Sequence, residues 1–322
     1  MNKMYISHPA SAQIPKLRKL WQNTFGDSDA FLDIFFETAF SPKRSFCATI
    51  NDTVIGALYW FDCECAEQKI AYLYAVATAK EFRGQGICHK LMVHTHQHLK
   101  EQGYAGAILS PAEESLFVFY GKMGYETCAY ASELHYTNTI ASLQRTQKTP
   151  ILQADSYKNT STYKNLNFHS EITGCENITS HKTLANCKNS TCFENTSILI
   201  QQITKADFAK LRRTFLPSDA IIQETENLDF LEKDAVFYTG EDFLLTAQII
   251  ENYDHNTPNG LLKKHLRGIE FLGDTAKIPA ILTFLECTSG EFRTIGNEKA
   301  IGMYYSFTDT KPTPTYIGLI FD

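Results

Sequence analysis

The sequence predicts a mixed α/β protein built from more than one unit. Residues 1–137 alternate segments that have the two-residue period of a strand with segments that have the three-to-four-residue period of a helix. A chain of 322 residues, 43% of them hydrophobic, is also long enough to form two cores of ordinary size. Together these two observations favour two domains with mixed sheets.

The elements of the first part can be assigned in order along the chain. The Asn51-Asp52-Thr53 stretch predicts a hairpin turn, because Asn and Asp tolerate the backbone angles of a tight turn. The expected order is a strand at 4–8, helices at 14–25 and 29–40, strands at 45–51, 54–65 and 70–78, a helix that starts after two glycines near 86, a strand at 105–110, a helix at 113–124 and a strand pair within 125–136.

The character of the sequence changes at residue 138. Of the 60 residues 138–197, 25 are Asn, Ser or Thr, which predicts a polar linker or insertion. Periodic segments return at 198–322, in an order similar to that of the first part. We therefore expect three regions: a first domain at 1–137, a linker at 138–197 and a second, similar domain at 198–322.

Composition excludes several classes of function. A formal charge of −6 and a pI near 5.9 provide no basic surface for a nucleic-acid backbone. The first 21 residues lack the apolar core of a signal peptide, and no stretch is apolar enough to span a bilayer. Nine cysteines without a regular spacing are typical of reduced thiols. The prediction is a cytoplasmic protein that binds neither nucleic acid nor membrane.

The junction Arg83-Gly84-Gln85-Gly86-Ile87-Cys88 lies where a strand gives way to a helix. Such a junction presents free amides and the positive end of the helix dipole, and glycines allow an anion to approach closely. The segment is neither the dinucleotide fingerprint, which has a third glycine, nor a P-loop, which has Gly-Lys-Ser/Thr. It predicts an anion site, and the alternative is a tight turn without a ligand.

Two segments resemble motifs of the GNAT superfamily of N-acetyltransferases. "VATAKEFRGQGICHKLM" is similar to the acetyl-coenzyme A motif, and "FVFYGKMGYE" is similar to the family's Phe-Tyr-x-x-x-Gly-Phe/Tyr segment. The order of elements also resembles the GNAT fold over residues 1–137. Lys80 stands where the family usually has Pro, and Cys88 where it usually has Gly or Ala. Cysteine is small enough to let the helix stay close to the loop.

The resemblance implies a binding site for acetyl-CoA as cosubstrate. The strand around Val76, Ala77 and Thr78 would pair with the pantetheine arm, and an amide near Val76 would polarise the thioester carbonyl. The pyrophosphate would lie on the amides of Gly84, Gln85, Gly86, Ile87 and Cys88, with Arg83 at the edge.

The resemblance also implies catalytic roles. Tyr120 matches the tyrosine that donates a proton to the departing thiolate, and a phenol is neutral at pH 7. The attacking amine needs a base or a water path, for which Glu113 and Glu114 are candidates, as are Glu64 and Glu67 after the long central strand. Asp322 is a further candidate, because the tandem layout resembles in part the enhanced-intracellular-survival acetyltransferases, whose terminal carboxylate serves the active site.

Two possible metal sites are disfavoured. His94 and His98 lie four residues apart on one helix face but lack an accompanying Glu or Asp. The linker contains cysteines and histidines without the close Cys-x-x-Cys spacing of zinc sites. These linker residues are Cys175, Cys187, Cys192, His169 and His181.

The sequence thus predicts an N-acetyltransferase that acts on an amine of a small molecule or peptide and uses no metal. The alternatives are a catalytically silent acyl-CoA-binding regulatory or scaffold protein, and a GNAT relative with another acyl or aminoacyl donor. The second part has no Arg-x-x-Gly-x-Gly match after its central strand, which predicts a domain without the phosphate cradle. The acceptor and the oligomeric state stay open.

Overall fold

A computed structural model describes residues 3–138, 199–254, 261–309 and 313–321. The linker cysteines and histidines and Asp322 lie outside these residues. The first part contains β1 (Met4–Ser7), α1 (Ile14–Phe25), α2 (Asp29–Thr38), β2 (Ser45–Ile50), β3 (Thr53–Cys65), β4 (Gln68–Thr78), α3 (Ile87–Glu101), β5 (Gly106–Leu109), α4 (Glu114–Gly121) and β6 (Glu126–Thr137).

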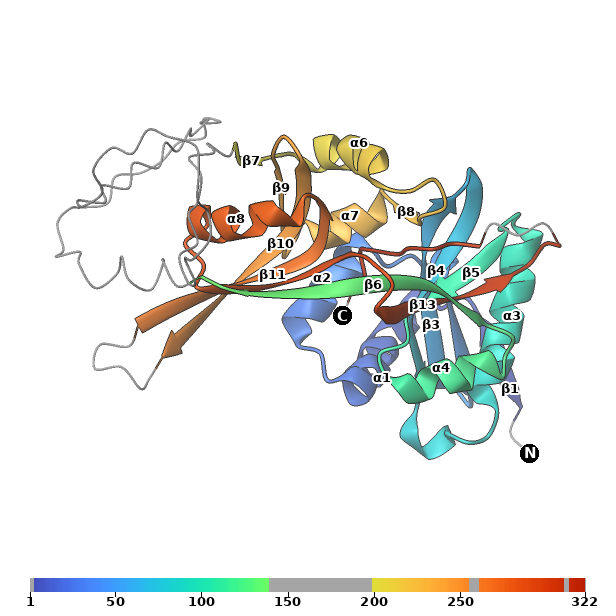
Figure 1. Ribbon diagram of the computed structural model, residues 1–322. Coiled ribbons are helices and arrows are strands. Elements are labelled where there is room, and N and C mark those ends of the chain that lie inside the picture. Colours follow the sequence, from blue (N-terminus) through green and yellow to red (C-terminus); the bar gives the residue numbers. More distant parts are fainter. Residues whose placement is uncertain (1–2, 139–198, 255–260, 310–312, 322) are drawn as a thin grey trace, which may run out of the picture.

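The second part resumes after the linker. Its elements are β7 (Gln201–Gln202), α6 (Lys205–Phe215), β8 (Ile222–Gln223), α7 (Glu226–Leu231), β9 (Val236–Thr239), β10 (Phe243–Asp254), β11 (Leu261–Gly273), α8 (Ile278–Phe284), β12 (Ser289–Ile295) and β13 (Lys299–Ser306). Both parts combine strands and helices, so the predicted mixed α/β class is confirmed (Figure 1).

Local sequence explains several of the element boundaries. The Ser28 side chain accepts a hydrogen bond from the Phe31 amide and caps the start of α2. Gly26 ends α1 in the left-handed conformation that favours glycine. Asn51 and Asp52 both have positive φ angles, 46° and 61°, at the turn between β2 and β3. The predicted hairpin turn is therefore confirmed.

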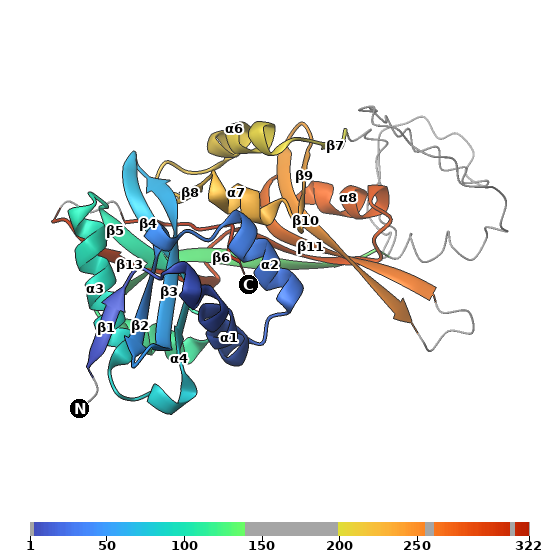
Figure 2. The ribbon, with the colours of Figure 1, turned by 180° about the vertical axis from the view of Figure 1, so that it is seen from behind.

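In the described part of the chain, thirteen strands belong to one mixed sheet. Twelve of them follow the order β1-β2-β3-β4-β5-β13-β6-β12-β11-β10-β9-β7, and β8 pairs with β3. The sheet runs through the whole molecule, with helices on both faces (Figures 1 and 2). One core contains Trp21 of α1 and Phe35 of α2, while Leu91 of α3 and Tyr120 of α4 belong to a different core on the opposite face.

The end of the first part differs from the sequence prediction. Residues 126–137 form one long strand, β6, and not the expected strand pair. The strand that separates β6 from β5 is β13, which comes from the other end of the chain. Residues about 170 positions apart therefore pair in the centre of the sheet, and no short-range pattern could have predicted this.

The pairing pattern of the first part recurs in the second. In the first part β2, β3 and β4 are antiparallel and β4 is parallel to β5. In the second part β9, β10 and β11 are antiparallel and β11 is parallel to β12. Each parallel pair is bordered by a strand from the other part, β13 beside β5 and β6 beside β12. None of the described helices has the length and apolar character needed to cross a membrane.

Candidate active site

Strand β4, the predicted cofactor-binding strand, contains a β-bulge shortly before its pairing with β3 ends at Thr78. Tyr74 pairs with Tyr59 and Ala77 pairs with Ala57, so β4 has one more residue than β3 in this interval. The extra residue gives Ala75 a φ angle of 48°, which is rare for a residue other than glycine. A bulge turns backbone groups out of the ladder, so it can present the amide near Val76 to a ligand.

A gap between β4 and β5 begins after Tyr72, before β4 reaches this bulge. The two parallel strands pair at Ile70, Ala71 and Tyr72 only, although β4 continues to Thr78. Strand β5 ends at Leu109. The edge of β4 that holds Val76, Ala77 and Thr78 is therefore not covered by β5, as the resemblance implied. Backbone amide and carbonyl groups that have no partner strand can form hydrogen bonds with an extended ligand.

The glycine loop, residues 83–88, lies between the end of β4 that borders this gap and the start of α3. Gly84 and Gly86 have φ angles of 75° and 74°, and Gly86 is the residue that precedes α3. A Cβ atom at either glycine would meet no atom within 4 Å, so the space in front of the loop is open. Among the described residues, no protein acceptor binds the amides of residues 84–88. These amides and the positive end of the helix dipole are therefore free to bind an anion.

Arg83 lies at the edge of the loop. Its Nε donates a hydrogen bond of 3.1 Å to the carbonyl oxygen of Thr78, the last residue of β4. The residue is otherwise exposed, which leaves the rest of the guanidinium group able to contact an anion at the loop. Gln85 stabilises the loop from the other side, because its Nε2 donates to the carbonyl of Glu81 at 3.2 Å.

Tyr120 is buried on the same face of the sheet as the glycine loop. Its ring packs against Tyr125, with 5.8 Å between ring centroids, in a core that also contacts Val76 and Cys88. Burial, and secondly the nearby Cys88 thiol, raise the pKa of the Tyr120 hydroxyl. The phenol is therefore protonated at neutral pH and available as a proton donor.

Cys88 packs beneath the loop at the start of α3. Burial raises the pKa of its thiol to about 11, which outweighs the effect of the helix N-terminus. The structure thus brings Val76, Cys88 and Tyr120 together from three separate elements.

The carboxylate candidates are distributed differently. Glu113 and Glu114 are exposed at the start of α4, shortly after β5 ends. Asp322 lies outside the described residues, but the preceding residue Phe321 packs on Tyr74, with 5.8 Å between ring centroids.

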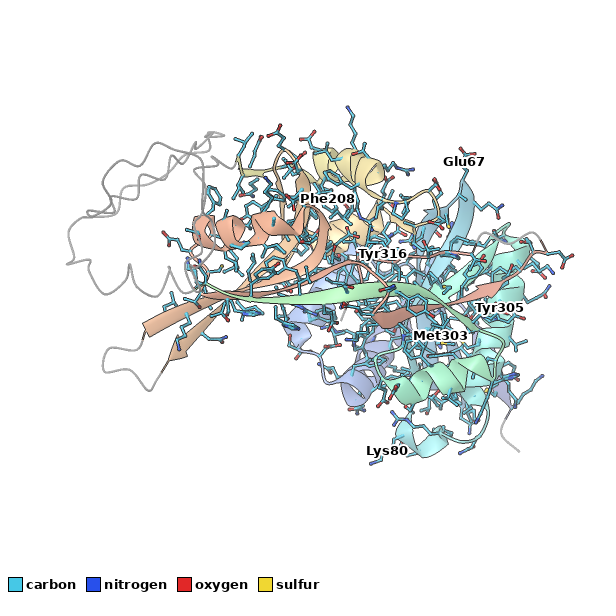
Figure 3. The ribbon with its side chains drawn as sticks, viewed as in Figure 1. Glu67, Lys80, Phe208, Met303, Tyr305 and Tyr316 are labelled. Atoms are coloured by element: carbon cyan, nitrogen blue, oxygen red, sulfur yellow. The ribbon has the colours of Figure 1, made fainter. Side chains whose placement is uncertain are left out.

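The structure excludes Glu64 and Glu67 from this site. Glu64 lies 3.3 Å from Arg213 in an ion pair, and Glu67 lies in the turn between β3 and β4. Glu67 and Lys80 lie at opposite ends of β4, and Lys80 is at the end that carries the glycine loop (Figure 3). The sequence predicts the long strand between them, but it does not indicate at which end of that strand the gap lies.

Two features of the site had no signal in the sequence. Alanine at position 75 is not a turn residue, so the bulge follows from the pairing of β3 and β4 and not from local preference. The contact of Phe321 with β4 brings together residues nearly 250 positions apart. The apolar run that ends the chain indicated burial there but not its location.

The matching region of the second part has no such opening. Strand β11 pairs with β12 from His265 as far as Phe271, close to its end at Gly273. Helix α8 begins at Ile278 and has proline in its first turn, where an amide donor is lost. No cluster of three or more His, Cys, Asp or Glu side chains suited to a metal occurs among the described residues.

Comparisons with known proteins agree with this geometry. Residues 6–128 match the model of an acetyltransferase (GNAT) domain. A search of curated proteins gave no match. Among solved structures, a GCN5-related N-acetyltransferase from Anabaena variabilis ATCC 29413 has a TM-score of 0.61 at 14% identity, over 94% of this chain and 72% of that one.

Two further solved structures extend over most of the chain. A GCN5-related N-acetyltransferase from Kribbella flavida has a TM-score of 0.59 at 11% identity, over 95% of this chain and 71% of that one. Eis1 from Mycobacterium abscessus has a TM-score of 0.53 at 11% identity, over 94% of this chain and 72% of that one. At these identities the structures show a shared fold. Residues 6–128 thus match an acetyltransferase (GNAT) domain, and the described parts of the chain share the fold of these solved N-acetyltransferases.

Proposed function

We propose that the protein transfers an acetyl group from acetyl-CoA directly to an amine. The observation that carries the proposal is the convergence of three features at the gap between β4 and β5. The free amides of the glycine loop, the bulge at Ala75 and the ring of Tyr120 come from different elements, and Val76, next to the bulge, packs in one core with Tyr120 and with Cys88 of the loop. An anion site alone would not require the bulge or the tyrosine.

The residues present fit the cosubstrate. The open space beside Gly84 and Gly86 would accept the pyrophosphate, and the lack of a Cβ atom at both positions lets the anion approach the backbone closely. The proposed contacts are the amides of Gly84, Gln85, Gly86, Ile87 and Cys88 with the pyrophosphate, Arg83 at its edge, and the free edge at Val76, Ala77 and Thr78 with the pantetheine arm.

The proposed reaction assigns one task to each group of the chain. The thioester supplies an activated acyl carbon, which the amine nitrogen attacks while the carbon–sulfur bond breaks. The amide near Val76 stabilises the negative charge on the carbonyl oxygen. Tyr120 donates its proton to the departing thiolate sulfur. The amine loses one proton to a base, so atoms and charges balance and no covalent enzyme intermediate forms.

The base is proposed among Glu113, Glu114 and Asp322. Glu113 and Glu114 are exposed, so they would accept the proton through water. Asp322 follows Phe321, which packs on the strand that carries the bulge.

We further propose that residues 198–322 form a second GNAT-like domain without catalytic function of its own. Its repeated pairing order supports this, as does the closed pairing of β11 and β12. On this proposal the second domain shapes the acceptor side of the active site.

The substitution Tyr120→Phe tests the proposal. We expect calorimetry to give an unchanged dissociation constant for acetyl-CoA, while thiol release with an amine acceptor falls at least a hundredfold. The alternative of a silent acyl-CoA-binding protein predicts no amine-dependent thiol release even from the unmodified chain. A relative that uses another donor would bind acetyl-CoA no better than free CoA and would release thiol only with that donor.

A further inference from the structure

The gap between β4 and β5 separates two faces that have different surroundings. Val76 packs with Cys88 and Tyr120 on the face covered by α3 and α4. Tyr74 and Ala77 pack on the opposite face, with α1 and α2. The glycine loop leads into α3 and so belongs to the first face. In the proposed reaction the amine then approaches from the second face, and the residues beside β4 there determine which amines fit.

That second face carries a group of aromatic side chains, here called the aromatic wall. Phe36 and Phe40 have ring centroids 4.8 Å apart, and Phe40 and Tyr59 are 6.1 Å apart. Tyr59 pairs with Tyr74 across the strands, and Tyr74 packs on Phe321. Phe36, Phe40, Tyr74 and Phe321 are only half-buried, so part of each ring is open to a ligand. The aromatic wall consists of Phe36, Phe40, Tyr59, Tyr74 and Phe321.

The polar groups of the wall suit a ligand with a single amine. The Tyr59 hydroxyl is buried and has no hydrogen-bond partner among the described residues, so an ammonium group that reached it on binding would supply the missing partner. The neighbouring Asp33 already pairs with Arg18 at 2.7 Å. The Arg18 guanidinium in turn lies over the Phe36 ring, 5.5 Å from its centroid. Arg18 also lies 3.6 Å from Asp29, so the two aspartates match its charge, and the five side chains of the wall themselves carry no carboxylate.

The last residue of the wall belongs to a C-terminal tail, residues 315–321. The Ile221 amide donates to the Tyr316 carbonyl at 2.8 Å. The Gln223 side chain bonds both backbone groups of Leu319, at 2.5 Å to its oxygen and 3.1 Å to its nitrogen. These bonds hold the tail against the second part of the chain and direct Phe321 onto Tyr74 and Phe230.

A buried ion pair lies directly beneath the tail. Arg212 of α6 binds the Glu270 carboxylate through two bonds of 2.6 and 2.8 Å, and both side chains are at most 2% exposed. A Cβ atom on Gly318 would lie 1.6 Å from a Glu270 oxygen. Tyr316, beside the same carboxylate, lies where the two parts of the molecule meet (Figure 3). The tail can therefore follow this path only with glycine at 318.

We propose that the acceptors are apolar monoamines, alkylamines or arylalkylamines, whose hydrocarbon part packs on the aromatic wall. The Arg212–Glu270 pair acts as a positioning pair that holds the tail, and thereby Phe321, at the wall. This inference rests on the proposed acetyl transfer and names its substrate class. The five side chains of the aromatic wall carry no carboxylate that could pair with the further charges of a polycation such as an aminoglycoside or a polyamine.

An acceptor panel tests the substrate class with the full chain. Thiol release from acetyl-CoA would be measured with 2-phenylethylamine, hexylamine, spermidine and kanamycin. We expect kcat/KM to be at least tenfold higher for the first two amines. Equal rates or a preference for the polycations would overturn this inference while leaving acetyl transfer in place. Absence of acetyl-CoA binding in calorimetry would instead refute the proposed function, so the two failures are distinguishable.

Substitutions in the tail test the positioning role. Gly318→Ala should raise the KM for 2-phenylethylamine at least tenfold without changing the dissociation constant of acetyl-CoA. Arg212→Met with Glu270→Met removes both charges together, which avoids leaving one of them buried alone. It should raise the same KM and speed hydrogen exchange at the Ile221 amide, which binds the tail.

The matched control is Arg213→Met with Glu224→Met, because this neighbouring pair is also bidentate but partly exposed. Neither the KM nor the exchange rate should change in this control. Phe321→Ala removes the ring without disturbing the ion pair and should raise the KM alone. Faster exchange at Ile221 with an unchanged KM would show that the tail does not form part of the acceptor site.

Discussion

Cys88 and Tyr120 belong to one buried cluster although they come from different helices, α3 and α4. After burial itself, the Cys88 thiol is the next cause that raises the pKa of the Tyr120 hydroxyl. Burial raises the pKa of Cys88 as well, to about 11. Both groups are thus protonated at neutral pH, so this cluster supplies a proton donor and not a thiolate nucleophile.

Cys88 should consequently react slowly with alkylating agents. With a pKa of about 11, about one thiol in a thousand is ionised at pH 8. We expect iodoacetamide to modify Cys88 at least a hundred times more slowly in the folded protein than in urea, as followed by peptide mass spectrometry. Labelling at the rate of the unfolded chain, or an acetyl group trapped on Cys88, would contradict direct transfer.

Gly86→Ala should weaken cosubstrate binding beyond its effect on stability. Gly86 has a φ angle of 74°, so alanine costs about 1–2 kcal/mol of stability. Its Cβ would also enter the open space beside the loop, where the proposed pyrophosphate binds. We expect the dissociation constant of acetyl-CoA in calorimetry to rise about tenfold or more.

Gly103→Ala is the matched control for that variant. Gly103 has a φ angle of 79° and open space around it, but it follows the other end of α3. The two variants should lose similar stability, and Gly103→Ala should bind acetyl-CoA as tightly as the unmodified chain. Equal affinities in all three proteins would remove the loop from the binding site.

The parts of the site that could be predicted from sequence are those governed by local backbone preference. Gly84 and Gly86 indicate the loop between β4 and α3, because a left-handed backbone and the close approach of a ligand to the backbone both favour glycine. Asn51 and Asp52 marked their turn in the same way. Tyr120 was found through a motif resemblance, and its burial beside Cys88 agrees with a role at the loop.

The parts that could not be predicted depend on pairing between distant residues. Strand β13 lies between β5 and β6. Its eight residues would fit equally well at an edge of the second part, so the local sequence does not indicate this central position. The strand pair expected within 125–136 is instead the single strand β6, which pairs with β13 from the far end of the chain. The bulge at Ala75 has the same origin, since only the register between β3 and β4 requires it.

The bulge gives a prediction about residue 75. Glycine tolerates a φ angle of 48°, whereas a β-branched side chain is strained there. Ala75→Gly should change the free energy of unfolding by less than about 1 kcal/mol and keep acetyl transfer. Ala75→Val should lower that free energy by about 1–3 kcal/mol or flatten the bulge, with a lower kcat in either case. Urea unfolding and thiol release measure both effects. A valine variant as stable and active as the unmodified chain would show that the bulge is not required.

His96 on α3 predicts a loss of stability in acid. Its Nε2 lies 2.7 Å from the Tyr125 hydroxyl oxygen, and its ring stacks near Tyr305 and Phe307. Burial, and secondly His89, lower the pKa of His96 from 6.5 to about 4. The neutral ring is favoured in the folded state, so its contribution is complete above pH 6.5. It is lost as the pH falls toward 4, because only the unfolded chain then binds the proton.

The size of this loss should be about 3 kcal/mol between pH 7 and pH 4. Urea unfolding at pH 7, 5.5 and 4 would measure it in the unmodified protein and in His96→Gln, in which this side chain cannot titrate. His96→Gln should have a lower free energy of unfolding than the unmodified protein at neutral pH, and that free energy should fall less as the pH is lowered. His94→Gln, at an exposed position of the same helix, should keep the full dependence. If His96→Gln and the unmodified chain lost stability in parallel, the acid sensitivity would have to come from other groups, such as His98, whose pKa burial also lowers.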